Sequence, residues 1–231
     1  MSESRRKKYT TKACAGWVTE LLSWSVKHGK KYPFRSASDP YRVLISELLL
    51  RQTTADQVSK VYRKFFVEYP TIEALSRASV SQLSRILRPL GIKSRAHTIL
   101  RVAQTIVREY AGTVPDTFEA LTSLDGVGPY TAACVLTFGY GQPTPMLDVN
   151  TSRVLTRIYG LGRGTSMVGK AWSIYREILS MDEPRHVHFA IIDLAHAVCR
   201  PTEPLCALCP CIQSCTYAGV IENTNPSKSG Q

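Results

Sequence analysis

The feature that most constrains the fold is a glycine-bearing hairpin near the middle of the chain. Asp125-Gly126-Val127-Gly128 lies between two short apolar segments with helical periodicity. Glycine lets the backbone turn sharply, and closely spaced backbone N–H groups in such turns bind phosphate. Asp148 follows at the expected start of another helix. The pattern therefore predicts a phosphate-binding site with a carboxylate available for chemistry on the bound molecule.

Basic residues outnumber acidic residues in this chain of 231 residues. It carries 29 Lys and Arg against 18 Asp and Glu, a formal net charge of +11. This excess suits a nucleic acid partner, because neutralising phosphates releases counterions, although many basic proteins bind no nucleic acid. Apolar runs fall short of the ~20 residues that cross a bilayer, and the opening MSESRRKKYTTK lacks an apolar signal segment. We therefore expect an intracellular protein, in which cysteines are thiols or metal ligands rather than disulfides.

Helical patterns account for almost the whole chain, so the expected fold class is all-α. Asp39 before Pro40 is typical of a helix N-cap. Cys14 and Cys134 lie in apolar helical patterns and are expected to pack in the core. Sustained period-two alternation is missing, so strands are not expected. The segments expected to be helical are residues 17–22, 40–50, 54–69, 71–78, 80–87, 94–110, 151–159, 167–179 and 188–198.

Four cysteines near the end of the chain are spaced closely enough to hold a metal centre. They are Cys199, Cys206, Cys209 and Cys215. Four thiolates can hold a tetrahedral zinc ion or an iron–sulfur cluster, and the residues alone leave both open. Zinc ribbons usually use two C-x2-C pairs, whereas this chain has one. Cys211 falls outside the spacing and is expected to be a bystander.

Three stretches together resemble the helix-hairpin-helix DNA glycosylases of the endonuclease III superfamily. The first is PFRSASDPYRVLISELLLRQTTADQV, residues 33–58. The second is LDGVGPYTAA with the downstream LDVN, and the third is the C-x6-C-x2-C-x5-C arrangement. They occur in the family's order over residues 32–217. Within the superfamily, the chain is most similar to thymine/guanine mismatch glycosylases, followed by adenine glycosylases.

The resemblance implies two all-α lobes with a cleft between them. A six-helix lobe carrying the hairpin would span residues 32–141, and a second lobe would combine residues 9–31 with residues 142–220. The four cysteines would hold a 4Fe–4S cluster, and for this reason we expect iron–sulfur rather than zinc. Tyr130 from the first lobe and Asp148 from the second would meet at the cleft.

The resemblance also implies catalytic roles. Breaking an N-glycosidic bond builds positive charge on the sugar, and Asp148 would stabilise that charge and orient or deprotonate water. Without the resemblance, Asp148 reads as a plain helix N-cap. Asn150 would support the carboxylate through a hydrogen bond to it or to the nearby backbone.

Tyr130 determines the expected reaction type. Family members that also cut the strand carry lysine after the hairpin proline, and its amine forms a Schiff base with the sugar. A phenol cannot form an imine, so we expect base removal with little or no strand cleavage. The alternative is that Tyr130 only packs on the hairpin.

Glu47 lies in the apolar segment 44–50, where an unpaired charge would be costly. The resemblance places it at the base pocket, where it could protonate or hydrogen-bond the leaving base. Burial would raise its pKa toward a value useful for an acid. The alternative is a structural salt bridge to Arg51, one helical turn away.

Removal of a base from duplex DNA requires the base to leave the helix, at a cost that is smaller for a mismatch. The resemblance implies that Gln52 fills the vacated space or touches the opposite base, and that Ile92 enters the stack as an apolar wedge; both could instead be helix-end packing. Gly126 and Gly128 would bring backbone N–H groups close to phosphate. Basic residues that could contact phosphate, or simply be solvated, are Lys93, Arg95 and Arg153.

The predicted function is a monofunctional DNA glycosylase of base excision repair that removes thymine or uracil mispaired with guanine. Its partner would be double-stranded DNA containing a mismatched or damaged base, and the protein would act as a monomer. One alternative is an adenine DNA glycosylase acting on adenine opposite guanine or oxidised guanine, but those enzymes typically place serine where Tyr130 stands. Another is a non-catalytic DNA-binding protein, which would be expected to lose Asp148 or Glu47.

Overall fold

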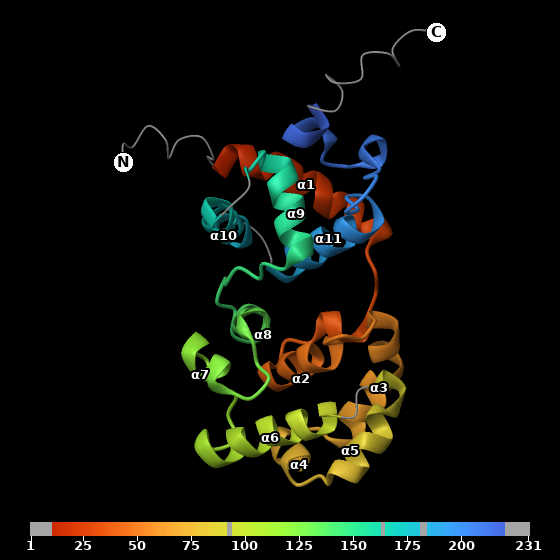
Figure 1. The fold of residues 1–231 in the computed structure, drawn as a ribbon, viewed down its shortest axis with the longest axis vertical. Helices are drawn as coiled ribbons and strands as arrows, with labels where there is room; N and C mark the ends of the chain where they lie inside the picture. Colours follow the sequence, from red (N-terminus) through yellow and green to blue (C-terminus); the bar gives the residue numbers. More distant parts are fainter. Residues whose placement is uncertain (1–10, 92–93, 163–164, 181–183, 220–231) are drawn as a thin grey trace. The chain divides into compact units, whose positions relative to one another are not determined.

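The computed structural model describes residues 11–91, 94–162, 165–180 and 184–219, with the backbone alone for residues 11–15 and 165–166. The regular elements of these ranges are helices, without a strand (Figure 1). No described helix is long and apolar enough to cross a membrane. Contacts divide the chain into two compact units, residues 31–144 and residues 1–30 with 145–231. The expected lobes, residues 32–141 and residues 9–31 with 142–220, stay a prediction.

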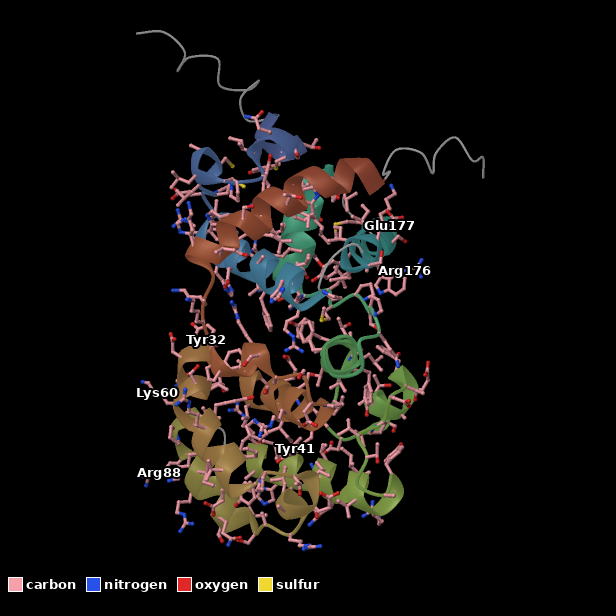
Figure 2. All side chains as sticks on the ribbon, turned by 180° about the vertical axis from the view of Figure 1, so that it is seen from behind. Tyr32, Tyr41, Lys60, Arg88, Arg176 and Glu177 are labelled. Atoms are coloured by element: carbon pink, nitrogen blue, oxygen red, sulfur yellow. The ribbon has the colours of Figure 1, made fainter. Side chains whose placement is uncertain are left out.

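The unit of residues 31–144 is built around helix α2 (Pro40–Leu50). This helix packs mainly against α3 (Ala55–Glu68), α6 (Ser94–Glu109), α8 (Pro129–Cys134) and the π-helix η4 (Val135–Gly139). Tyr41 near its start is buried, and its hydroxyl donates a hydrogen bond of 2.7 Å to the carbonyl of Tyr69. Figure 2 shows Tyr41 among packed side chains, with Lys60 and Arg88 at the surface of the same unit. The remaining helices are η2 (Pro33–Ser36), α4 (Ile72–Ser76), α5 (Val80–Leu87), η3 (Arg88–Leu90) and α7 (Phe118–Ser123).

Local sequence explains where these helices begin and end. The Asp39 side chain accepts a hydrogen bond of 2.9 Å from the Arg42 N–H, which confirms the expected N-cap of α2. Helix α6 ends at Glu109 because the next residues include Ala111 and Gly112, whose φ angles of 51° and 79° leave the right-handed helical region. Side-chain N-caps also begin α3, α4, α5 and α7, at Thr54, Thr71, Ser79 and Thr117.

The second unit packs α11 (Pro184–Ala197) against α1 (Thr11–His28), α9 (Val149–Tyr159) and α10 (Thr165–Leu179). Trp17 is fully buried in its core, and its Nε1 donates a hydrogen bond of 2.9 Å to the Tyr159 hydroxyl. Two short 3-10 helices follow, η5 (Cys206–Leu208) and η6 (Ile212–Ser214).

Helix α11 begins at Pro184, one turn before the segment around residues 188–198 that the apolar pattern indicated. Proline is favourable at the first position of a helix, where its missing N–H is not needed. The apolar pattern becomes visible only further along, since the first turn carries Arg185 and His186.

Candidate active site

The hairpin connects α7 to α8, and its two glycines differ in backbone conformation and in the space around them. The Val127 N–H donates to the Leu124 carbonyl at 3.0 Å, which closes the turn. Gly126 has a φ of 75°, and a Cβ atom there would lie 2.6 Å from Thr98 Cγ2. Gly128 has a φ of −92°, and a Cβ atom there would meet nothing within 4 Å. The described fold therefore requires glycine at position 126, while the surface at Gly128 is open to a molecule outside the chain.

Tyr130 is the second residue of α8 and is partly exposed, directly after the exposed Pro129. Helix α8 continues into the π-helix η4, a conformation frequent at functional sites. A Cβ atom on Gly139 in that segment would lie 2.9 Å from Pro40 Cα. This close approach holds the segment after Tyr130 against α2, the helix that carries Glu47.

Glu47 lies in the middle of α2, mostly shielded from solvent. Burial raises the pKa of its carboxyl group from 4.5 to about 7, against a smaller lowering by a hydrogen bond from the Cys134 thiol. Cys134 itself is fully buried, as expected for a core residue. The alternative partner Arg51 directs its Nη1 to the Gly126 carbonyl at 2.7 Å. Burial therefore raises the pKa of Glu47 in the direction that suits a proton donor.

Gln52 is exposed in the turn that follows α2. The Thr53 N–H donates to the Leu50 carbonyl at 3.2 Å, and Arg51 has φ −60° and ψ 122°. Together with the φ of 51° at Gln52, these values fit a type II turn, whose third residue is usually glycine or asparagine. A glutamine side chain in the left-handed region costs roughly 1–2 kcal/mol. The chain thus presents Gln52 on a strained turn and does not pack it at the helix end.

Asp148 is the N-cap of α9, as its sequence context suggested. Its Oδ1 accepts hydrogen bonds from the N–H groups of Asn150 at 3.0 Å and Thr151 at 2.7 Å. Its Oδ2 accepts a hydrogen bond of 2.9 Å from Asn150 Nδ2. The side chain is partly exposed. Oδ1 therefore caps the helix, while the Asn150 side chain orients Oδ2.

Arg153 extends this arrangement toward the cysteines. Its Nη2 donates to Asn150 Oδ1 at 3.1 Å, and its Nε donates to the Cys199 carbonyl at 3.0 Å. Nη2 also lies 3.1 Å from the Ala195 carbonyl. Arg153 is therefore bonded within its own unit, and its suggested phosphate contact stays a prediction. Arg95, another suggested phosphate contact, is only 5% exposed and also bonds within the fold.

The four expected cysteine ligands line one cavity with about 290 Å³ of empty space, part of it open to solvent. Cys211 is not among the lining residues; it is fully buried, and its Sγ lies 3.8 Å from the Trp17 carbonyl. A hydrogen bond from Cys211 lowers the pKa of Cys209 to about 7, whereas burial raises the pKa of Cys206 and Cys215. Within the described ranges, no three His, Cys, Asp or Glu side chains form a site for one metal ion. The structure thus brings the four expected ligands, but not Cys211, around one cavity.

Two contacts of the site were not anticipated from the sequence. One is the hydrogen bond from Cys134 to Glu47. The other is made by Arg157, whose Nη1 donates to the Arg200 carbonyl at 2.6 Å and lies 3.4 Å from Cys199 Sγ. Arg153 and Arg157 are four positions apart, so they share one face of α9. This spacing could have indicated from the sequence that they act together. Their acceptors lie more than forty positions away, beyond the reach of any local pattern.

Ile92 and Lys93, the expected wedge and phosphate contact, lie outside the described residues. Among the other expected site residues, the unit of residues 31–144 contains Glu47, Gln52, the two hairpin glycines and Tyr130, while the second unit contains Asp148, Asn150 and the four cysteines.

Comparisons with known proteins identify the family. The model of the HhH-GPD superfamily base excision DNA repair proteins matches residues 45–173. A thymine/uracil-DNA glycosylase of Pyrobaculum aerophilum is 36% identical over 82% of this chain and 86% of its own length. An adenine DNA glycosylase of Buchnera aphidicola is 30% identical over 84% of this chain, which spans 57% of that protein. A solved thermostable thymine-DNA glycosylase, 29% identical, superposes with a TM-score of 0.82 over 92% of this chain and 100% of its own. The chain therefore belongs to the HhH-GPD superfamily of base excision DNA repair proteins.

Proposed function

We propose that this protein is a monofunctional DNA N-glycosylase that removes thymine or uracil mispaired with guanine. Tyr130 carries the proposal, because it stands where strand-cutting members of the family carry a lysine. A phenol cannot form the imine through which those members cut the strand. The similarity to the Pyrobaculum thymine/uracil-DNA glycosylase supports the choice of base.

Asp148 would supply the main stabilisation of the reaction. Loss of the base leaves positive charge on the deoxyribose, and a fixed carboxylate lowers the energy of that state. The hydrogen bond from Asn150 holds Oδ2 in one orientation, so the carboxylate does not have to reorganise during the reaction. The same carboxylate would orient the water that attacks the sugar and take its proton.

Glu47 would act on the leaving base. With a pKa of about 7, its carboxyl group is protonated in a substantial fraction of molecules at neutral pH and can donate a proton or a hydrogen bond. Thymine and uracil leave as anions that need less help than adenine, so we expect Glu47 to accelerate the reaction rather than to be indispensable.

The hairpin and the Gln52 turn would bind the DNA. The open surface at Gly128 lets a phosphate approach the backbone, and the formal charge of +11 favours the polyanion. Gln52, exposed on its strained turn, would fill the space left by the extruded base. Ile92 and Lys93 keep the roles that the family resemblance implies, a wedge and a phosphate contact.

We further propose that the cavity lined by Cys199, Cys206, Cys209 and Cys215 holds a 4Fe–4S cluster. When bound, the cluster would supply a cross-link of the C-terminal loop to the end of α11, which Cys199 follows, rather than any step of base removal. Arg157 would stabilise the thiolates through its charge beside Cys199 Sγ. Cys211, bonded into the core, would not be a ligand.

We also propose that the protein acts as a monomer inside the cell, where its DNA substrate is. One lesion needs one site, and a single chain supplies all the residues of the proposed reaction: Glu47, Tyr130 and Asp148. Sedimentation of the protein with and without duplex DNA tests this: a 1:1 complex is expected, and a stable dimer would contradict it.

Adenine removal is a second candidate, favoured by the raised pKa of Glu47, since adenine must be protonated to leave readily. Single-turnover incubation with duplexes containing T·G, U·G, A·G or adenine opposite oxidised guanine separates the two. We expect strand breaks at T·G and U·G, and only after hot alkali. Breaks at the adenine pairs alone would favour the second candidate, and breaks without alkali would contradict the monofunctional assignment. DNA binding without cleavage of any substrate would indicate a non-catalytic protein.

A further inference from the structure

The strained turn after α2 is stabilised from inside the fold by an arginine. Arg95, near the start of α6, is 5% exposed, an unusual degree of burial for this residue type. Its Nη2 donates hydrogen bonds to the Arg51 carbonyl and, at 2.5 Å, to Thr53 Oγ1. These two acceptors flank Gln52, the residue with the φ of 51°.

Nothing in the described surroundings offsets the charge of this arginine. Burial lowers the pKa of Arg95, and the nearby charge of Arg51 lowers it further. Its Nη1 is buried and finds no acceptor among the described residues. A buried cation is costly without a counter-charge, so packing alone would favour an apolar residue here. The chain instead carries an arginine, whose Nη2 reaches both sides of the Gln52 turn.

Arg51 links the arginine at position 95 to the hairpin. Its backbone carbonyl accepts from Arg95, and its own Nη1 donates to the Gly126 carbonyl at 2.7 Å. Gly126 in turn lies so close to Thr98 of α6 that a Cβ atom would approach Thr98 Cγ2 to 2.6 Å. The Gln52 turn and the hairpin are thus held relative to one another through Arg51 and through α6.

We propose that Arg95 is a positioning residue that holds Gln52 in its left-handed conformation, in register with the hairpin, so that its side chain enters the duplex when the base leaves. This inference rests on the proposed function. Non-glycine residues persist in such conformations where the surrounding structure determines them, and these positions cluster at functional sites. Glycine would fit the turn without strain, but it would leave no side chain to enter the DNA.

A purely structural arginine and a positioning arginine give different results. We compare Arg95→Met, which removes both hydrogen bonds at similar side-chain volume, with Arg95→Lys, which keeps the charge. Arg108→Met is the matched control, because Arg108 lies on the same helix, is 67% exposed and pairs with Glu109. For each variant, the rate of thymine release is measured under single-turnover conditions on two substrates. One is a T·G duplex, and the other is the same strand with the thymine in an unpaired bubble.

We expect Arg95→Met to slow release from the duplex relative to the bubble by between about tenfold and a hundredfold, the range that a misplaced positioning group costs. Arg95→Lys should lie between Arg95→Met and the wild type, and Arg108→Met should leave the ratio unchanged. An equal loss on both substrates, or no loss, would overturn the proposal. If Arg95→Met does not fold, the ratio of duplex to bubble release is measured for Arg95→Lys instead, and a ratio equal to that of the wild type would overturn the proposal.

A second measurement does not depend on catalysis. Hydrogen exchange followed by mass spectrometry reports the Thr53 N–H, which is bonded to the Leu50 carbonyl in the turn. We expect faster exchange in peptides covering residues 50–54 of Arg95→Met and unchanged exchange in Arg108→Met; unchanged exchange in both would overturn the proposal. If the wild type releases no base from any duplex, the proposed function fails, while the exchange result still decides whether Arg95 holds the turn.

Gln52→Gly provides the complementary test. Because glycine adopts a positive φ freely, the variant should melt at a temperature higher by about 2 °C and yet release thymine from the duplex more slowly. In this background Arg95→Met should no longer change the duplex-to-bubble ratio, since there is no side chain left to position. A full additional effect of Arg95→Met would contradict the proposal.

Discussion

The Cys134 thiol donates a hydrogen bond to the Glu47 carboxylate, and so joins the helix after the hairpin to the helix before the Gln52 turn. The bond favours the ionised carboxylate, whereas burial favours the protonated one, and burial has the larger effect. The proton affinity of Glu47 is therefore set by two helices that both carry residues of the proposed site.

Cys134→Ala should shift the pH dependence of base release to higher pH. Loss of the donor removes stabilisation of the ionised carboxylate, so the pKa of Glu47 should rise above about 7, by up to about one pH unit. Rates measured from pH 5 to 9 under single-turnover conditions test this. Cys134→Ser keeps a hydroxyl donor and serves as the control. A profile of Cys134→Ala that coincides with that of Cys134→Ser would show that the thiol does not tune Glu47.

Glu47 should also make stability depend on pH. Its pKa in the folded protein is about 7, against 4.5 for the ordinary group. Between these values the folded state binds more protons than the unfolded state, so stability should fall as pH rises through this window and should level off above it. Thermal melts of the wild type and Glu47→Gln at pH 5 and pH 8 test the sign. The variant should lose this part of the pH dependence, and an equal decrease in both proteins would assign it to other groups.

Asp148→Asn should abolish most base release while the protein still folds and binds DNA. Asparagine is as good an N-cap as aspartate, so α9 should remain intact. Without the negative charge, the rate should fall by at least about a hundredfold. Single-turnover assays and gel-shift titrations with a T·G duplex measure the two effects. Retained turnover would remove Asp148 from the mechanism. Asp148→Ala loses both the N-cap and the charge, so its difference from Asp148→Asn measures the contribution of the N-cap alone.

Tyr130→Lys should convert the protein into one that can be trapped on DNA. A lysine amine near the sugar would form an imine, which borohydride reduces to a stable covalent complex. A slower-migrating band on a denaturing gel is the readout. Tyr130→Phe keeps the ring without an amine and should give no band. If Tyr130→Lys also gives none, the side chain at this position does not face the sugar.

Cys206→Ser should lose the cluster, whereas Cys211→Ser should keep it. Cys206 lines the cavity, while Cys211 is fully buried beside the Trp17 carbonyl. Iron content and visible absorption of the purified variants test this, and thermal melts should show some loss of stability for both. Iron loss in Cys211→Ser with iron retained in Cys206→Ser would reassign the ligand set. A colourless wild type that contains zinc would contradict the iron–sulfur assignment.

Helix positions could be predicted from the sequence because they depend on local signals. Residues 80–87 coincide with α5, and the Asp39 cap begins α2 where expected. The raised pKa of Glu47 was also predictable, because a carboxylate inside an apolar helical run has few ways to stay solvated.

The Gln52 turn could not be predicted in this way. Turn rules expect glycine or asparagine at that position, so a glutamine gives no signal of a left-handed residue. The buried Arg95 was misjudged for a related reason, since an arginine in a basic chain is normally solvated. Both depend on a contact between segments more than forty positions apart.

The order of the two units along the chain has a consequence for synthesis on the ribosome. Residues 31–144 form one uninterrupted stretch, so this unit can fold as soon as it has emerged. Helix α1 is synthesised before this unit, yet the hydrogen-bond partner of Trp17, Tyr159, follows 142 positions later. The apolar face of α1 must therefore stay uncovered until residue 159 has been synthesised, and chaperones have the opportunity to bind it during that time.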